Sequence, residues 1–415
     1  MHVAHSPHIA IITGAHLCRN PRVVKEALAL DRAGYEVSII LPTLDKNLKA
    51  EDDRIVGESD VRRHYSVDLS AGGMGATWSR GRRRLAEEAK ARLRVEVADS
   101  LGYSIRHALK IARELKADYY IGHQEVGAWV AWKLMREGHR VGADLEDWYS
   151  RDLLPEARSK RPVRLLDRIE RDLVRDAAHC TTTSVAMASA MEEAYGQRPD
   201  VIYNAFPYQE RDQIDGLHLD RADLETPSLF WFSQTIGPGR GLEELIAGIH
   251  LVDIPCQLHL RGNVDAAYQR HLRASFTKKA GYSIHFHDLV PPRELPGRIS
   301  EHDVGLALEP AHPPNKNLTV SNKIFHFLQA GLGVVATPTA GQKEVAAAAP
   351  SVIPIADHTP EALAVAINEL AGSPERLQRA KRLALQAAES TFSWEVQEPR
   401  LLELVARALN RPIKT

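Results

Sequence analysis

Short apolar runs recur along the whole chain, and stretches with the apolar spacing of a helix separate them. The first two runs are 8-HIAIIT-13 and 35-YEVSIILP-42, with a helical pattern over 21–33 between them. Strands that are apolar at every position are typical of a parallel sheet covered by helices on both faces. The sequence therefore predicts an α/β fold built on parallel sheets.

This rhythm is interrupted once, by a polar stretch over 205–225, and begins again at 228-SLFWFS-233. The other expected strands are 118–122, 140–145, 179–183 and 200–203 before this stretch, and 256–261, 282–286, 303–308, 333–337 and 352–355 after it. We therefore predict two doubly wound, Rossmann-like domains, 1–205 and 226–390, which face a cleft and bind ligands beyond the carboxyl ends of their strands. The segment 391–415 is predicted to form an amphipathic helix with no strand after it.

The composition is that of an ordinary globular protein, with 44% hydrophobic and 26% charged residues in 415. A net charge of -1 gives no general attraction to nucleic acid, so no nucleic-acid partner is expected. The three cysteines lie far apart without metal-ligand spacing, which favours a reducing compartment. Because no long apolar run is present, we predict a cytoplasmic protein.

One segment, 80-RGRRRLAEEAKARLR-94, is helical in pattern and dense in arginine. Two interpretations are open. The region Arg80–Arg94 is either a solvated face supported by Glu and Arg pairs one turn apart, or a patch that makes peripheral contact with anionic lipid at the inner membrane face.

The second domain opens with a glycine-rich turn, 236-IGPGRGLEELI-246. Gly237, Gly239 and Gly241 let the backbone approach a ligand closely, and the helix that follows offers free N–H groups to an anion. Arg240 can add a charge-assisted contact. The spacing differs from the G-x-G-x-x-G dinucleotide pattern, and the same glycines are also compatible with a simple turn.

A second helix start lies in 321-SNKIFHFLQAG-331. Ser321 or Asn322 is a natural N-cap, and the glycine at the end is a natural stop. Lys323 and His326 are three residues apart and share one face near the helix start, where an anion would rest. The alternative for His326 is a packing or exposed position. Two anion-suited helix starts in one domain indicate a diphosphate, and hence a nucleotide-activated substrate.

Ordered stretches over nearly the whole length resemble the GT-B fold glycosyltransferases, in particular the retaining family 4. They are 13-TGAHLCRNPRVVKEALALDRAGYEVSII-40, 144-DLEDWYS-150, 183-TSVAMASAMEEAYGQRPDVIYNAFP-207, 236-IGPGRGLEELI-246, 287-HDLVPPRELPGRISEHDVGLAL-308, 321-SNKIFHFLQAGLGVVATPTAG-341 and 393-SWEVQEPRLLELV-405. The resemblance implies that the C-terminal helix crosses back to the first domain.

The resemblance also implies roles for single residues. Gly14 and Ala15 would form the first-domain loop facing the donor, and Arg240 and Lys323 would contact the diphosphate together with N–H groups near Ser321 and Asn322. Many members carry a glutamate pair spaced E-x7-E, whose second member binds the ribose. Here those two positions are Leu318 and His326, and Glu309 lies nearby at a different spacing. A histidine can hydrogen-bond a ribose hydroxyl but is no charged acceptor.

Polar residues also follow two strands of the first domain. His123 follows one strand, and Asp144, Glu146 and Asp147 follow another. At a sheet edge these groups can orient or deprotonate an acceptor hydroxyl. The alternative is that the aspartates cap the next helix and that His123 closes a turn.

Together with the resemblance, which alone implies retention, these observations predict a metal-independent hexosyltransferase that needs no cofactor. Its donor would be a UDP- or dTDP-linked sugar, and its acceptor a glycan, a lipid-linked species or a small molecule in cell-surface polysaccharide, glycolipid or natural-product synthesis. Arg240 and Lys323 would stabilise the leaving diphosphate. Two alternatives stay open: an epimerase or phosphorylase of the same fold, and a non-catalytic binding protein of that fold.

Overall fold

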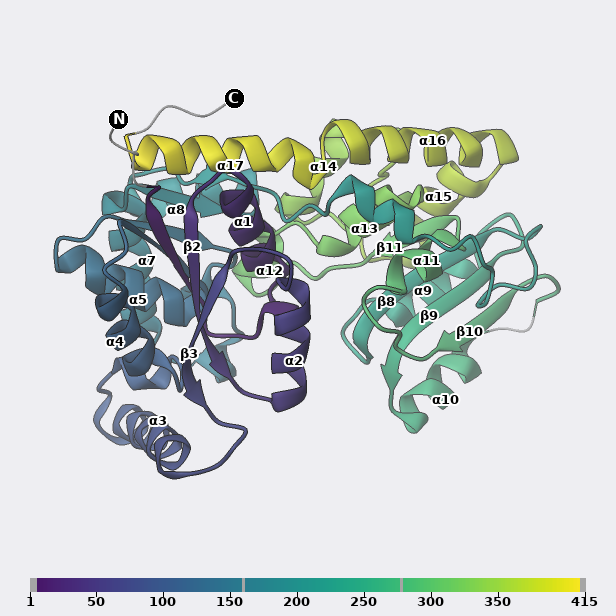
Figure 1. The fold of residues 1–415 in the computed structure, drawn as a ribbon. Helices are drawn as coiled ribbons and strands as arrows, with labels where there is room; N and C mark the ends of the chain where they lie inside the picture. The colour runs from purple at the N-terminus through teal and green to yellow at the C-terminus, as the bar shows by residue number, and fades with distance from the viewer. Residues whose placement is uncertain (1–5, 159–160, 277–278, 411–415) are drawn as a thin grey trace. The chain divides into compact units, whose positions relative to one another are not determined.

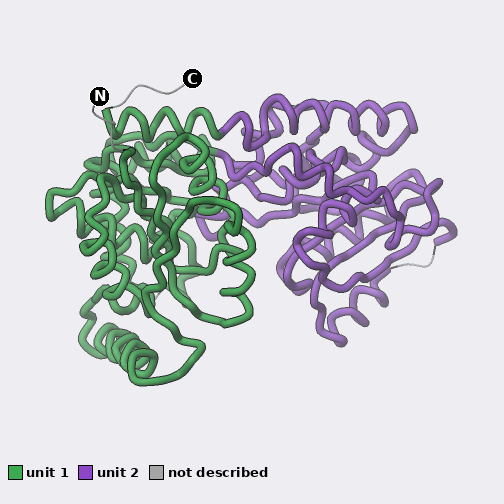
Figure 2. The backbone as a smooth tube through the Cα atoms, viewed as in Figure 1, with its two compact units in different colours: residues 1–202, 398–415 green, residues 203–397 purple. Residues whose placement is uncertain are grey.

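The computed structural model describes residues 6–158, 161–276 and 279–410. The chain divides into two compact units, one formed by residues 1–202 with 398–415 and the other by residues 203–397 (Figure 2). The stretch 206–225, which the sequence analysis left between the domains, belongs to the second unit.

The first unit is built on a seven-stranded sheet in the order β3-β2-β1-β4-β5-β6-β7, in which every pairing is parallel (Figure 1). Its strands are β1 (His8–Ile12), β2 (Glu36–Thr43), β3 (Arg62–Asp68), β4 (Tyr119–His123), β5 (Val141–Leu145), β6 (His179–Thr182) and β7 (Asp200–Val201). The strand β3 was not predicted, because its run RRHYSVD is mostly polar and only partly buried.

The helices of this unit connect successive strands. They are α1 (Pro21–Arg32), α2 (Lys46–Ile55), α3 (Met74–Leu93), α4 (Ile105–Leu115), α5 (Gln124–Arg136), α6 (Pro155–Arg158), α7 (Val163–Asp176) and α8 (Val185–Tyr195), with short 3-10 turns at Leu17–Arg19, Ala98–Ser100 and Tyr149–Arg151. Helix α5 begins very close to the sheet, since a Cβ on Gly127 would lie 2.1 Å from the carbonyl oxygen of Ile12. Only glycine permits this approach, which brings the start of α5 against the end of β1.

The second unit is built on a five-stranded parallel sheet in the order β10-β9-β8-β11-β12. Its strands are β8 (Ser228–Ile236), β9 (Gln257–Val264), β10 (Ser283–His287), β11 (Val304–Ala307) and β12 (Gly333–Ala336). The strand predicted at 352–355 is wrong, because only Ile355 forms an isolated bridge to Ala336 there.

The helices of this unit are α9 (Leu242–Ile249), α10 (Ala266–Ser275), α11 (Leu295–Ser300), α12 (Pro314–Leu318), α13 (Asn322–Ala330), α14 (Ala340–Ala348), α15 (Pro360–Ala371) and α16 (Pro374–Ser390), with a 3-10 turn at Tyr208–Gln213. Helix α13 packs closely on the sheet, since a Cβ on Gly305 would lie 2.2 Å from Cγ of Phe327. Ile324, Phe327 and Leu328 are among its buried residues, and the expected stop at Gly331 ends it with a φ of 79°.

The last helix, α17 (Trp394–Ala408), begins in the second unit and ends in the first. Val405 and Ala408 are buried in the same apolar cluster as Ile9 and Ile39 of the first sheet. The predicted fold class, with two Rossmann-like sheets and a C-terminal helix that returns to the first, is confirmed. Among the described residues, none of the helices is long and apolar enough to span a bilayer.

Candidate functional site

Each sheet has one point at which the direction of strand addition reverses, and ligands of doubly wound sheets bind beyond the strand ends at this point. In the first unit it lies between β1 and β4, and in the second between β8 and β11. Several residues singled out in the sequence follow these four strands. Each unit is described by itself below.

The loop after β1 holds Gly14 and Ala15 against the start of α5. Thr13 donates its hydroxyl to Oε1 of Gln124 at 2.9 Å and accepts a hydrogen bond from the backbone N–H of Ala15. A Cβ on Gly14 would lie 2.8 Å from Cγ2 of Val126, so a larger residue would press on this helix. Both loop residues are partly exposed.

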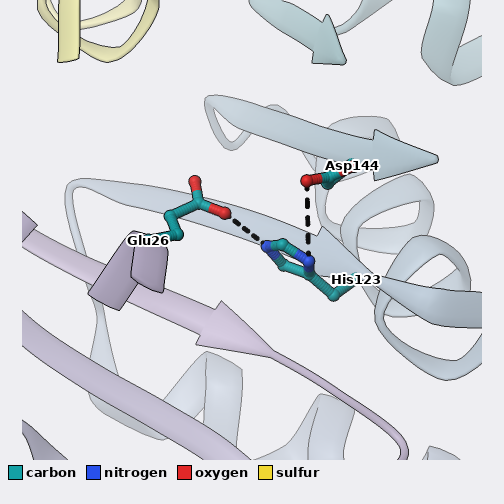
Figure 3. Close-up of side chains that lie close together, drawn as sticks. All are labelled: Glu26, His123 and Asp144. Carbon is teal, nitrogen blue, oxygen red and sulfur yellow. Dashed lines mark hydrogen bonds and ion pairs between the residues drawn. The ribbon is translucent and has the colours of Figure 1, made fainter. Parts of the chain in front are cut away.

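His123 is the last residue of β4 and is fully buried. Its Nε2 lies 2.5 Å from Oε2 of Glu26, and its Nδ1 lies 3.8 Å from Oδ2 of Asp144 (Figure 3). Nδ1 also lies 3.4 Å from Oε1 of Glu146. Burial by itself disfavours the charged ring, but the three carboxylates outweigh it and raise the pKa of His123 to about 10. His123 is therefore an imidazolium at neutral pH. A charged ring is better suited to orienting an acceptor than to accepting its proton, and the role of His123 at the acceptor stays a prediction.

The start of α1 holds two acidic residues at the end of β5, Asp144 within the strand and Glu146 directly after it. Arg22 places its Nε 2.6 Å from Oδ2 of Asp144 and also donates to the carbonyl of Ile202. Asn20 donates to Oε1 of Glu146 at 2.8 Å. The alternative for Asp144 was that it caps the next helix. Its contact with Arg22 is an ion pair and is not such a cap. The Glu146 side chain is 18% exposed, whereas those of His123 and Asp144 are at most 4% exposed, so Glu146 is the accessible member.

Asp147 is half-buried next to Glu146. Asn20, Arg22 and Glu26 were not identified from the sequence as site residues. The sequence did contain a signal for them. The segment 20-NPRVVKE-26 places polar and charged residues on a helix that packs on the sheet, and Arg22 and Glu26 are one turn apart on it. A charged residue at a buried helical position needs a partner.

Glu26, His123 and Asp144 each offer an atom that lies within 4.8 Å of the others, a grouping that could hold a metal ion. The donor set fits an ion poorly in this arrangement. The two ring nitrogens of His123 face different carboxylates, and the guanidinium of Arg22 already lies on Asp144. Two buried cations thus compensate the carboxylates, and the cluster is best described as a network of ion pairs. The absence of a metal from the reaction stays a prediction.

In the second unit, the glycine-rich loop after β8 leads into α9. Gly239 and Gly241 have φ values of 71° and 73°, a left-handed conformation that favours glycine. A Cβ on Gly241 would lie 3.2 Å from Nδ1 of His358 and 3.6 Å from Cβ of Leu308, so the loop lies near the end of β11. Gly237 is partly exposed and Arg240 is exposed. Within the described part of the chain, Arg240 has no ion-pair or hydrogen-bond partner.

Glu309 follows β11 and binds the start of α13. Its Oε1 lies 2.5 Å from Nζ of Lys323 and accepts a hydrogen bond from the hydroxyl of Ser321 at 2.9 Å. Burial would raise the pKa of Glu309, but Lys323 and the hydroxyl of Ser321 lower it below its ordinary value. Lys323 also lies over the buried ring of Trp231, with Nζ 5.4 Å from the ring centroid.

Ser321 is the N-cap residue of α13, but its hydroxyl makes no capping hydrogen bond. Because Ser321 donates to Glu309 instead, its side chain leaves the first N–H groups of this helix available to a ligand. Asn322 is exposed at the same helix start. The spacing of Glu309 differs from that of the glutamate pair in the resembled family, yet its side chain joins Ser321 and Lys323.

His326 lies one turn further along α13 and packs among aromatic rings. It stacks on Phe206 with ring centroids 3.8 Å apart, and Phe232 approaches it edge-on at 5.9 Å. The ring is partly exposed. His326 therefore packs against other side chains, as one of its two interpretations held. Its contact with a ribose stays a prediction.

Comparisons with known proteins agree with this arrangement. Residues 20–205 match the family model described as glycosyl transferase 4-like domain. The matched residues include the buried cluster of Glu26, His123 and Asp144, together with Asn20 and Glu146. A comparison with curated proteins by sequence finds no match.

Solved structures similar to the whole chain extend the likeness in fold beyond residues 20–205. Sucrose-phosphate synthase from Thermosynechococcus elongatus has a TM-score of 0.70 at 14% identity, with 97% of this chain and 99% of that chain covered. Anabaena HepE in complex with UDP-glucose has a TM-score of 0.67 at 15% identity, with 96% and 99% covered. A glycosyltransferase from Rickettsia africae has a TM-score of 0.64 at 13% identity, with 98% and 100% covered. These likenesses establish the GT-B fold, and the resemblance to family 4-like enzymes is confirmed.

Proposed function

We propose that the protein is a glycosyltransferase that moves a sugar from a nucleoside-diphosphate sugar to an acceptor hydroxyl. The observation that carries the proposal is the position of Lys323. Glu309, which also accepts a hydrogen bond from Ser321, holds it at the start of α13, at the point where the second sheet reverses direction. A UDP- or dTDP-linked sugar is the proposed donor, and the UDP-glucose complex of HepE supports this choice.

The start of α13 suits a diphosphate for two reasons. Free N–H groups and the helix dipole attract an anion. In addition, the Lys323 ammonium has three N–H donors, of which Glu309 takes one. The remaining donors can meet phosphate oxygens. Arg240 adds a second, uncompensated cation on the loop before α9.

Fixed positive charge is the chemistry that the reaction needs at this place. As the sugar leaves, negative charge develops on the diphosphate, and cations that are already in position stabilise it without reorganisation. Lys323 and Arg240 would supply this charge without a metal ion. We propose that the transfer is retaining, a view that rests on the resemblance to family 4.

In the first unit, Glu146 is the group proposed to orient or deprotonate the acceptor. It is the most accessible carboxylate of the cluster and is held by Asn20. Nδ1 of His123 lies 3.4 Å from Oε1 of Glu146 and helps to hold this carboxylate in place. Asp144, which is bound to Arg22, would fix the loop, and Asp147 stays an acceptor-side candidate.

The acceptor would be a glycan, a lipid-linked species or a small molecule, in the synthesis of cell-surface polysaccharide, glycolipid or a natural product. We place the reaction in the cytoplasm. All three cysteines are free, which agrees with a reducing compartment.

The test is incubation with a panel of UDP- and dTDP-sugars, with and without candidate acceptors, followed by measurement of released nucleotide and of each sugar product. Release that depends on an acceptor, with the sugar found on the acceptor, is the expected result. Conversion of one nucleotide sugar into another would indicate an epimerase instead. Binding without any turnover would indicate a binding protein, and absence of binding would overturn the donor site. The anomeric configuration of the product by NMR tests retention.

A further inference from the structure

Helix α3 (Met74–Leu93) presents apolar side chains to solvent along one face. Met74, Trp78 and Leu85 are 91%, 67% and 71% exposed, and Leu93 at the helix end is 71% exposed. Met74, Trp78 and Leu85 follow one another at helical spacing, so they form one stripe. An exposed stripe of large apolar residues marks an interaction surface.

The opposite face of α3 explains this orientation. The buried residues of the helix are all small, namely Ala76, Ser79 and Ala86. The helix thus packs on the first unit through its small residues and points its large apolar residues outward. Figure 1 shows α3 on the outside of that unit, beyond α4. The hydrophobic effect alone would favour the reverse orientation.

The charge of the helix identifies the kind of partner. Residues 74–94 contain seven Lys or Arg and two Glu. Several of these cations have acidic partners, such as Arg83 with Glu87. Among the described residues, Arg84 and Arg94 have none, and both are exposed. A helix with Trp, Leu and Met on one face and a surplus of arginine beside them fits an anionic lipid surface.

We propose that α3 docks on an anionic lipid bilayer, with Met74, Trp78 and Leu85 inserted at the interface and the arginines on the headgroups. Trp suits this position because its ring is apolar while its N–H stays near water. At about 1.5 Å per residue, the helix would lie about 30 Å along the surface. A second copy of the chain is disfavoured, because a two-fold contact would place this basic surface against itself.

This proposal stands on α3 alone and does not require the proposed transfer reaction. If the acceptor is lipid-linked, the two combine, since docking would bring the enzyme to its acceptor. Vesicle binding and acceptor-dependent nucleotide release are separate measurements, so failure of one does not decide the other.

Trp78 supplies a direct reporter of docking. It is 67% exposed, whereas each of the other five tryptophans is at most 9% exposed. They are Trp129, Trp132, Trp148, Trp231 and Trp394. A blue shift of the emission and quenching by brominated lipid on addition of vesicles would therefore report Trp78. We expect both with phosphatidylcholine vesicles containing about a third phosphatidylglycerol, and neither with pure phosphatidylcholine.

Variants separate the apolar contribution from the charge. Leu85→Ser should reduce the vesicle partition coefficient at least tenfold, while Leu219→Ser, which removes a side chain of the same 71% exposure in the second unit, should leave it unchanged. Arg84→Glu with Arg94→Glu should have a similar effect, and Arg293→Glu none. These side chains are at the surface, so the variants should fold, which circular dichroism checks.

Equal binding to neutral and anionic vesicles, or binding that the α3 variants leave unchanged, would overturn the proposal. So would self-association without vesicles that Leu85→Ser abolishes, since the stripe would then be covered by a second copy. Analytical ultracentrifugation of the wild type and Leu85→Ser measures this.

Discussion

Nε2 of His123 lies 2.5 Å from Oε2 of Glu26, and both side chains are at most 3% exposed. This contact joins α1 to the end of β4, at the point where the first sheet reverses direction. A buried ion pair is costly to break, because the partner left behind is an uncompensated charge. The pair therefore fixes the position of His123, and through it the carboxylate of Glu146.

The first prediction concerns the pH dependence of stability. The pKa of His123 is raised to about 10, above the ordinary value of 6.5. The stabilisation from its ion pairs is thus fully present below about pH 6.5 and is lost as the pH rises through about 10. Glu26→Gln removes the main partner and should lower the free energy of unfolding by roughly 3 to 5 kcal/mol at pH 6.5. The difference from wild type should shrink toward pH 10.

Urea unfolding at pH 6.5, 8.5 and 10 measures this difference, with the exposed Glu58→Gln as the matched control. A difference that stays constant over this range would show that His123 is not charged in the folded protein.

The second prediction concerns Lys323 and Arg240 in donor binding. Lys323→Ala and Arg240→Ala should each weaken UDP binding by roughly 1.5 to 3 kcal/mol, the range for hydrogen bonds to charged groups. Lys323→Ala also leaves the carboxylate of Glu309 uncompensated near the proposed diphosphate. Its effect should therefore be smaller, by about 1 kcal/mol or more, when Glu309→Gln is already present.

Calorimetry on the two single variants and the double variant gives this coupling. Lys343→Ala, which removes an exposed cation elsewhere in the unit, should bind UDP like the wild type. Additive effects of the Lys323 and Glu309 changes would contradict a shared role. Unchanged affinity in both Lys323→Ala and Arg240→Ala would refute the diphosphate site.

The fold was largely predictable because most of its strands are continuous apolar runs. The run IAII in β1 and the run VVA in β12 are buried at every position, so their pattern is unambiguous. Strand β3 escaped prediction because it lies at the edge of its sheet and is largely polar. The run VIPI was predicted as a strand from its apolar character, but it contains a proline, which cannot donate to a ladder.

The site was predictable only where a local pattern marks it. Helix α13 is visible in the sequence, because a cap residue and a lysine mark its start and a glycine marks its end. The partners of these groups come from distant segments: Glu309 is 14 residues from Lys323, and Glu26 is 97 residues from His123. The spacing of residues within one helix cannot predict such distant pairs. The order of the strands in the sheet brings the two partners of each pair together. For the same reason the protonation state of His123 could not be anticipated.

The third prediction concerns chelation. Because Arg22 and His123 compensate the carboxylates of the first unit, and Lys323 and Arg240 are proposed to meet the diphosphate, transfer should persist in excess EDTA. We expect less than a twofold loss of initial rate. A rate that falls tenfold or more and returns on addition of Mg²⁺, Mn²⁺ or Zn²⁺ would reassign Glu26, His123 and Asp144 as metal ligands.

The fourth prediction concerns Glu146, which is the accessible carboxylate of the first unit and accepts a hydrogen bond from Asn20. If it orients or deprotonates the acceptor, Glu146→Gln keeps the hydrogen bond but loses the charge. General base catalysis contributes roughly 10² to 10⁴ in rate, so kcat should fall by at least about 10² while the affinity for UDP stays unchanged. Glu193→Gln, an exposed change on α8, serves as the control. A wild-type kcat in Glu146→Gln would move the acceptor role to Asp147, and weakened UDP binding would place Glu146 in the donor site instead.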